Sequence, residues 1–277
     1  MEFSFHNFVY ARGQDAASKT AAGINTRVGR HAAGLHNRQM IKHLLLTAGL
    51  IFSLGCTKKE PITITIVDIG RLNRAGIAKE LSIVNKYSPK VIGLDFLLTT
   101  DSLDKDILLS EELARTPNMV QATQLFNNDP IDDTKWDSLK IYHPKFRFGR
   151  HGFTNLTMTD ELVFVPELPM RQYYRDDTEF AFSYLIASEY DHLRVNEKYK
   201  SGDHDFSFDS DSFGHHFKII SVKDLLSENF DRNDLTGKIV LMGHVSDRED
   251  SFYLDDRRTK RISGVEIHAG IIKEILD

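Results

Sequence analysis

The 277-residue sequence lacks several features by which classes of proteins are identified. It contains one cysteine, Cys56, which excludes an intrachain disulfide and zinc sites built on several cysteines. Its longest apolar run, Leu44–Leu54, has 11 residues, about half of the roughly 20 that a membrane-spanning helix needs. Lys and Arg number 35 against 40 for Asp and Glu. The resulting net charge of -5 argues against a protein that mainly binds nucleic acid phosphates.

Acidic residues are also missing from one long segment. Residues 16–59 carry seven basic side chains and no acidic one, and residues 1–15 carry a net -1, which leaves -11 for residues 60–277. The apolar run inside this basic leader follows Lys42 and ends at Gly55-Cys56. This arrangement resembles a bacterial secretory signal whose cleavage leaves an acylated N-terminal cysteine, although Ser53 stands where an apolar residue is usual. We therefore expect a signal peptide or lipoprotein anchor in residues 40–59, with lipidation at Cys56; an uncleaved signal anchor and a buried helix are the alternatives.

The leader also predicts where the protein is located and where its folded part begins. Met40 opens a normal short signal, so residues 1–39 are expected to be a disordered tail or a mis-annotated leader. Residues 60–277 then form the folded domain. Both the lipoprotein and the signal-anchor interpretations place this domain in the cell envelope, anchored to a membrane and facing the periplasm or the cell surface.

The acidic part alternates β-branched runs with amphipathic stretches. This pattern predicts an α/β fold, with a mostly parallel sheet flanked by helices in three layers and no second domain. We expect strands at residues 62–67, 90–97, 118–125, 162–165, 217–220 and 238–243. We expect helices at residues 75–87, 178–190, 222–226 and 264–276, and one that carries Leu109 and Leu113 and is capped by Asp101 or Ser102. Right-handed crossovers would place the first three strands side by side.

Polar residues at the predicted strand ends are the candidates for ligand binding. Ligands of such sheets bind outside the carboxyl ends of the strands, where Asp68, Asp95 and His244 fall. Each of these side chains is also suited to capping a helix or accepting loop hydrogen bonds. Asp250 suits a pocket or a surface ion pair, and His268 lies on an apolar helix stripe, where a hydrogen-bonded core histidine is the simpler interpretation.

Motifs for catalysis, metals and cofactors are incomplete. Asp95 begins like the nucleophile loop of phosphatases of the haloacid dehalogenase type, but Leu97 replaces the required second carboxylate. The acidic segment 203–211 suggests a calcium loop, yet Phe213 and Ile220 occupy ligand positions. Gly237-Lys238 lacks the surroundings of a phosphate-binding loop. We therefore expect no metal, no cofactor and no enzymatic activity, and keep a strand-end carboxylate hydrolase and a structural lipoprotein as alternatives.

Five strings resemble the second type of CHASE domain, in the order expected for that family. They are residues 91–96 (VIGLDF), 152–155 (GFTN), 235–243 (LTGKIVLMG), 250–252 (DSF) and 264–269 (GVEIHA). The resemblance covers about residues 62–277, and it adds Asn155 to the candidate ligand-binding residues. It implies a bacterial extracytoplasmic sensor domain of the kind joined to adenylate cyclases, histidine kinases and Ser/Thr kinases. The Asp-Gly-Arg that usually follows the second string is replaced here by Asp160-Glu161 without the Arg.

The resemblance also implies how the domain would act. The expected function is ligand sensing in a bacterial signal-transduction system, with an unidentified small molecule or protein as ligand and no nucleic acid partner. Family members continue after the last helix into transmembrane helices and an output domain. Because this sequence ends at Asp277, we expect either a fragment or a stand-alone sensor that passes its signal to a separate transmembrane partner.

The lipoprotein interpretation makes a testable prediction. Metabolic labelling of cells with a radioactive fatty acid should label the wild-type protein, and Cys56→Ser should abolish the label because the acylated thiol is gone. Intact mass of the native protein should show a chain that lacks Met1. Labelling that survives in Cys56→Ser would contradict the prediction.

Overall fold

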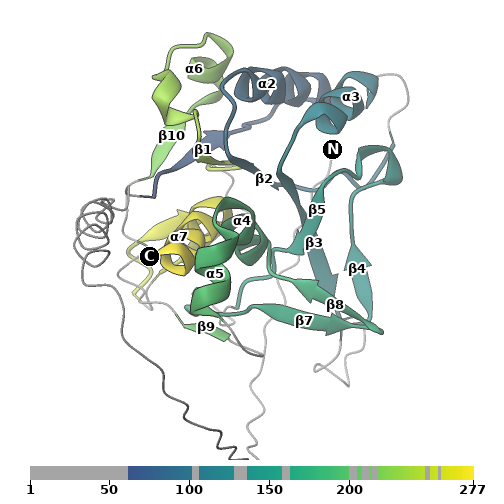
Figure 1. Cartoon of the computed structure of the whole chain (residues 1–277), viewed down its shortest axis with the longest axis vertical. Helices are drawn as coiled ribbons and strands as arrows, with labels where there is room; N and C mark the ends of the chain where they lie inside the picture. The colour runs from purple at the N-terminus through teal and green to yellow at the C-terminus, as the bar shows by residue number, and fades with distance from the viewer. Residues whose placement is uncertain are drawn as a thin grey trace, which may run out of the picture. The chain divides into compact units, whose positions relative to one another are not determined.

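The computed structural model describes residues 62–101, 106–127, 136–157, 163–199, 205–207, 213, 217–246, 250–254 and 257–277. Within these residues a seven-stranded sheet has the order β10-β1-β11-β2-β3-β4, with β5 also paired to β3 (Figure 1). Its strands are β1 (Ile64–Asp68), β2 (Val91–Asp95), β3 (Met119–Phe126), β4 (Ser138–Lys140), β5 (Arg150–Phe153), β10 (Lys218–Ile220) and β11 (Ile239–Gly243). The leader with Cys56 lies outside the described residues, so the predictions on it remain untested.

The central strands are parallel, and their order corrects one prediction. β10, β1, β11, β2, β3 and β5 run in the same direction, and β4 alone pairs antiparallel, with the last residues of β3. The expectation that the first three strands lie side by side is wrong, because β11 is inserted between β1 and β2. The crossover from β1 to β2 therefore spans one strand position, and a strand from late in the chain fills the gap.

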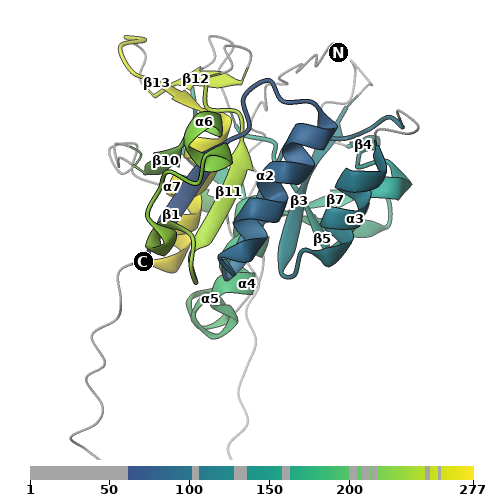
Figure 2. The ribbon, with the colours of Figure 1, turned by 90° about the horizontal axis from the view of Figure 1, so that it is seen from above.

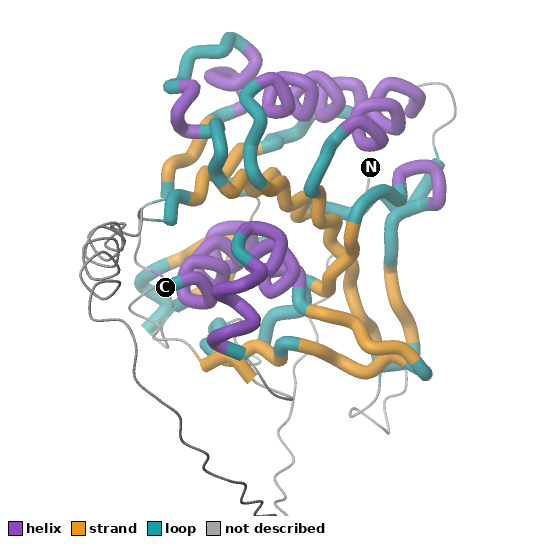
Figure 3. Tube along the Cα trace, in the orientation of Figure 1, coloured by secondary structure: helices purple, strands orange, loops and turns teal. Residues whose placement is uncertain are grey.

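Helices cover both faces of the sheet, which confirms the predicted three-layer α/β fold (Figures 1 and 3). One face carries α2 (Arg74–Lys86), α3 (Ile107–Arg115) and α6 (Val222–Leu226), and the other carries α4 (Phe182–Tyr190), α5 (His192–Lys198) and α7 (Gly264–Leu276). Alternate side chains of each strand face opposite layers: Ile64 and Ile66 pack toward α4 and α7, and Val67 toward α2. Burial on both faces explains why β2 and β11 are almost entirely apolar.

Three small antiparallel pairs accompany the main sheet. They are β6 (Glu167–Pro169) with β9 (Asp205–Ser207), β7 (Arg171–Tyr174) with β8 (Asp177–Phe180), and β12 (Ser251–Tyr253) with β13 (Arg261–Ser263). The predicted helix at residues 178–190 is wrong over its first four residues, because residues 178–180 belong to β8 and the helix begins at Phe182. The predicted strand at residues 162–165 is reduced to one bridge between Val163 and Tyr253, and Leu162 is outside the described residues.

The starts of α6 and α7 follow local sequence signals, whereas that of α3 does not. Ser221 caps α6 by accepting from the amide of Asp224, and α7 spans the predicted residues behind a capping box of Ser263 and Glu266. The predicted cap of α3 at Asp101 or Ser102 is wrong, because α3 begins at Ile107. Short 3-10 helices, η3 (Pro144–Phe146) and η5 (Arg232–Asp234), complete the described elements.

Gly152 of β5 permits a close approach between the sheet and the backbone of α4. A Cβ at this position would lie 2.7 Å from the Phe182 Cα and 2.8 Å from its amide nitrogen, and both are backbone atoms that cannot move independently of the helix. The glycine of the GFTN string therefore has a packing role.

Substitution of this glycine should destabilise the protein. We expect Gly152→Ala to lower the free energy of unfolding by about 3 kcal/mol, the upper end of the usual range for overpacked cores, in urea denaturation. Gly237→Ala is the control, because a Cβ there meets nothing within 4 Å and only the positive φ of 68° is unfavourable, at about 1 kcal/mol. Equal losses in the two variants would show that the contact with α4 is unimportant.

Candidate functional site

Three residues form a row across the carboxyl ends of the central strands. Asp68 of β1 pairs in register with Gly243 of β11, which pairs in register with Asp95 of β2. In-register neighbours point to the same face, and this face is the one covered by α7, since a Cβ on Gly243 would lie 3.0 Å from Val265 and 3.2 Å from the Asp95 Cβ. We call Asp68, Gly243 and Asp95 the strand-end row.

Asp68 holds two loops at this edge. Its Oδ1 accepts hydrogen bonds from the amides of Gly70, at 3.1 Å, and Val245, at 3.3 Å. These bonds connect the turn after β1 with the segment after β11, and His244 lies partly buried between Gly243 and Val245. The structure thus brings the predicted residues Asp68, Asp95 and His244 to one edge, with Asp68 acting as a loop brace.

Asp95 differs from Asp68 in its polar partners. Among the described residues, no hydrogen bond or ion pair to its carboxylate is found. Burial raises the pKa of Asp95 to about 7, and the nearby carboxylate contributes to the raised pKa of Tyr142, whose hydroxyl donates to the Phe96 carbonyl. Asp95 itself is only partly shielded from solvent. A carboxyl group that changes charge near neutral pH and lacks a fixed partner is suited to binding a ligand.

Sequence reasoning missed a second perturbed carboxyl group, Glu80 of α2. Its side chain is 0% exposed, and neither oxygen has a hydrogen-bond partner. Burial raises its pKa to about 8, and repulsion from Asp68 adds to the shift, so Glu80 is mostly protonated at neutral pH. Glu80 lies three residues after Ile77 and four residues before Val84. This helical spacing is the signal that could have placed Glu80 near the apolar face of α2.

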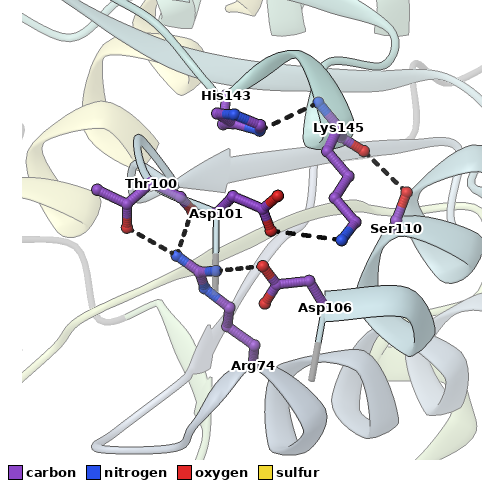
Figure 4. A network of polar contacts seen from close by, with 7 residues as sticks. All are labelled: Arg74, Thr100, Asp101, Asp106, Ser110, His143 and Lys145. Atoms are coloured by element: carbon purple, nitrogen blue, oxygen red, sulfur yellow. Dashed lines mark hydrogen bonds and ion pairs between the residues drawn. The ribbon is translucent and has the colours of Figure 1, made fainter. Parts of the chain in front are cut away.

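A buried ion pair connects the start of α2 with the start of α3 (Figure 4). Arg74, at the start of α2, donates to the Asp106 carboxylate at 2.6 Å and to the Thr100 carbonyl at 2.6 Å, and its guanidinium lies 5.1 Å from the Phe146 ring centre. The two charged side chains are 7% and 0% exposed. Nearby, Lys145 pairs with Asp101 at 3.3 Å. Because both charges of the Arg74–Asp106 pair are buried, removing one partner would leave the other uncompensated.

Asp250 lies at the first turn of α7. Its carbonyl accepts from the Gly264 amide at 3.1 Å, and a Cβ on Gly264 would lie 2.6 Å from Asp250 Oδ1. A carboxylate at a helix N-terminus is favoured by the helix dipole and by the unpaired amides there. The glycine of the GVEIHA string therefore makes room for Asp250, which lies next to α7.

Asn155 and His268 have structural partners. Asn155 donates to the Leu125 carbonyl and accepts from its amide, both at 2.8 Å, and so extends the pairing of β5 with β3. His268 is 2% exposed, its Nδ1 lies 2.8 Å from the Ser183 hydroxyl, and the backbone of Thr154 also contacts the ring. Burial lowers the pKa of His268 to about 4, so it is neutral. The hydrogen-bonded core interpretation of His268 agrees with these contacts.

Two arrangements that catalysis could use are buried in the described residues. Leu97, where a hydrolase would need its second carboxylate, is 8% exposed and packs in the core beneath α2. Ser183, which faces His268, is 0% exposed and so cannot meet a substrate. Within the described residues, no cluster of three or more His, Cys, Asp or Glu side chains is placed to hold a metal ion.

Comparison with known proteins identifies the family. The sequence model of the CHASE2 domain matches residues 59–277, which confirms the resemblance carried by the five strings. No curated protein matches the chain, and no solved structure matches it. CHASE2 domains are extracytoplasmic sensor domains.

Glu80 makes the stability of the domain pH-dependent. The pKa of Glu80 is about 8 in the folded protein, whereas its ordinary value is 4.5. The unfolded chain therefore loses this proton at a lower pH than the folded protein does. Glu80 therefore stabilises the fold below pH 4.5, and this contribution is lost as the pH rises toward 8. Glu80→Gln mimics the protonated group, so we expect it to raise the free energy of unfolding at pH 8 by more than about 1 kcal/mol and to change it little at pH 5.

Urea denaturation at both pH values tests this prediction. Glu111→Gln is the matched control, because the Glu111 side chain is 55% exposed on α3. A gain for Glu80→Gln that is the same at pH 5 and pH 8 would show that the carboxyl group does not titrate between them.

Proposed function

Because the chain belongs to the CHASE2 domain family, whose members are extracytoplasmic sensors, we propose that its strand-end row binds a small ligand. The observation that carries the proposal is Asp95, which has a pKa of about 7 and no hydrogen bond or ion pair among the described residues. A ligand that carries a positive charge or hydrogen-bond donors fits this carboxylate. A cation would bind the ionised form, so its affinity would rise as the pH increases through 7.

Helix α7 could transmit a change at the strand-end row to the opposite edge of the sheet. Val265, in the first turn of α7, packs against Gly243 in the middle of the row. The 13 residues of α7 extend about 20 Å from there along β11 and β1. At its far end, Lys198 of α5 donates to the Glu274 carbonyl at 2.8 Å, and Arg194 donates to the Asp277 carbonyl at 3.2 Å. A ligand that displaces Val265 would therefore move an element that reaches the opposite edge.

The topology also suggests an orientation for the anchored domain. β1 starts at the amino edge of the parallel sheet, and α7, which begins beside the end of β11, finishes at that same edge (Figure 2). An anchor at residues 40–59, lipidated at Cys56, would attach just before β1. The amino edge would then face the membrane and the strand-end row would face away from it, toward the periplasm or the cell surface.

Signal output requires a further component in this proposal. Within the described residues, no helix combines the length and the apolar character needed to cross a bilayer. We propose that either a following segment of a longer chain or a separate transmembrane partner receives the signal from α7. Binding would act by shifting the population of domain conformations, without turnover of the ligand.

A thermal-unfolding screen tests the proposed site. We expect a compound from pools of small amines, amino acids and sugars to raise the Tm of the wild-type protein, since a ligand at 100 times its Kd adds about 2.7 kcal/mol of stability. Asp95→Asn should remove most of this shift. Asp176→Asn, in an exposed turn, is the control and should keep it.

Three results would overturn the proposal in different ways. Equal stabilisation of wild type and Asp95→Asn would place the ligand elsewhere. Substrate turnover that Asp95→Asn abolishes would favour the hydrolase. Complete absence of stabilising compounds, together with a growth or envelope defect on deletion, would favour the structural lipoprotein.

A further inference from the structure

Glu80 is a buried carboxyl group that its surroundings do not satisfy. Its side chain is 0% exposed, and neither of its oxygens has a hydrogen-bond partner. Polar groups in protein cores are ordinarily paired, and the few exceptions are often places where a structure stores strain or performs a function. The packing of α2 alone does not require a carboxyl group at this position, so Glu80 is a candidate for a further role.

The charges near Glu80 oppose its ionisation. Asp68, at the end of β1, is the charged group that acts on it, and repulsion between the two carboxyl groups adds to the effect of burial on the pKa of Glu80. Within the described part of the chain, no cation is paired with Glu80. The other charged groups on α2 and the elements around it are exposed, hold other partners or, like Asp95, face the α7 layer. They are Arg71, Arg74, Lys79 and Lys86 on α2 and the turn before it, Asp106, Glu111, Glu112 and Arg115 at α3, Lys223 and Asp224 on α6, and the pair Lys218–Asp234.

Helix α2 is held at both ends, so it resists turning Glu80 out into water. It lies between α6 and α3 on one face of the sheet (Figure 1). At its start, Arg74 forms the buried ion pair with Asp106 (Figure 4). Near its end, Asn85 donates to the Glu112 carboxylate on α3 at 3.1 Å. Movement of the helix is therefore a costly way to relieve a charge on Glu80.

The loops held by Asp68 are the more easily moved side of this pair. Asp68 accepts from the amides of Gly70 and Val245, at 3.1 and 3.3 Å, and these are its hydrogen bonds within the described residues. All three residues are only partly buried. A negative charge on Glu80 would push the Asp68 carboxylate away and weaken both bonds, which would release the turn after β1 from the segment after β11.

We propose that Glu80 is a proton switch whose ionisation loosens the two loops at the strand-end row. With the proton bound, Asp68 braces both loops; without it, the brace is weakened. Because burial and Asp68 raise the pKa of Glu80 to about 8, the change takes place under mildly alkaline conditions. The proton acts from the α2 layer and requires no ligand, whereas the row faces the α7 layer, so this inference does not depend on the proposed function.

The NMR signals of the Gly70 and Val245 amides in the full chain test the proposal. We expect both signals to move between about pH 7 and pH 9, one unit on either side of the pKa of Glu80, with a common midpoint near pH 8. Glu80→Gln keeps the shape of the protonated side chain and should abolish this movement, while its spectrum at pH 7 should match that of the wild type. Glu80→Leu is a second uncharged variant and should also abolish it.

Two control variants separate Glu80 from other carboxyl groups. Asp95→Asn removes the group whose pKa is about 7, and Glu111→Gln removes an exposed carboxylate from α3; both should keep the movement near pH 8. Asp68→Asn tests the coupling itself. It should move the midpoint of the Glu80 amide signal to lower pH, because the repulsion that contributes to the raised pKa is gone.

Amide hydrogen exchange measures the loosening directly. At pH 9 the Gly70 and Val245 amides should exchange about tenfold faster in the wild type than in Glu80→Gln, the effect of a coupling of about one pKa unit, and at nearly equal rates at pH 7. Movement that persists in Glu80→Gln, wild-type signals that stay fixed, or equal exchange at pH 9 would each overturn the switch. Both measurements are made without ligand, so their failure is distinct from failure of the proposed ligand site.

Discussion

The insertion of β11 between β1 and β2 is the constraint on which the rest of the structure depends. Both neighbours pair with it along their full length, and they do not pair with each other. The strand-end row exists only because this strand brings Gly243 between Asp68 and Asp95. The absence of a side chain at Gly243 admits Val265, and with it α7, to the same edge. Sheet order, candidate site and the position of the last helix thus follow from one pairing.

The sequence predicted elements better than their arrangement. Apolar runs such as residues 238–243 and the helix Gly264–Leu276 carry their periodicity and caps locally, so their existence and limits can be read directly. Strand order depends on pairing between distant segments, which no local pattern records, and the simplest crossover gave the wrong neighbours for β1 and β2. The β7–β8 hairpin escaped prediction because its residues are mostly polar and partly exposed, so it lacks the alternation of a half-buried strand.

For the candidate site, too, local sequence predicted some features, and others depend on tertiary packing. Asp68 and Asp95 could be placed because the carboxyl ends of parallel strands meet at one edge whatever their order. Glu80 and the Arg74–Asp106 pair were missed, since a charged residue on an amphipathic helix is ordinarily exposed and only the packing of α2 against its neighbours buries these. His268 was expected on an apolar helix stripe, but its partner Ser183 is fixed by tertiary contacts. Asn155 was proposed from the family resemblance alone, because β5, which positions it beside Leu125, was not predicted.

The late position of β11 in the chain has a consequence for biosynthesis. When residues 62–127 have left the ribosome, β1, β2 and β3 are present, but β1 has no partner until β10 (residues 218–220) follows, and the facing sides of β1 and β2 have none until β11 (residues 239–243) follows. Unpaired apolar strand edges are templates for association with other chains. A nascent chain that ends near residue 127 therefore exposes these edges, which favours its association with other chains until the later strands emerge.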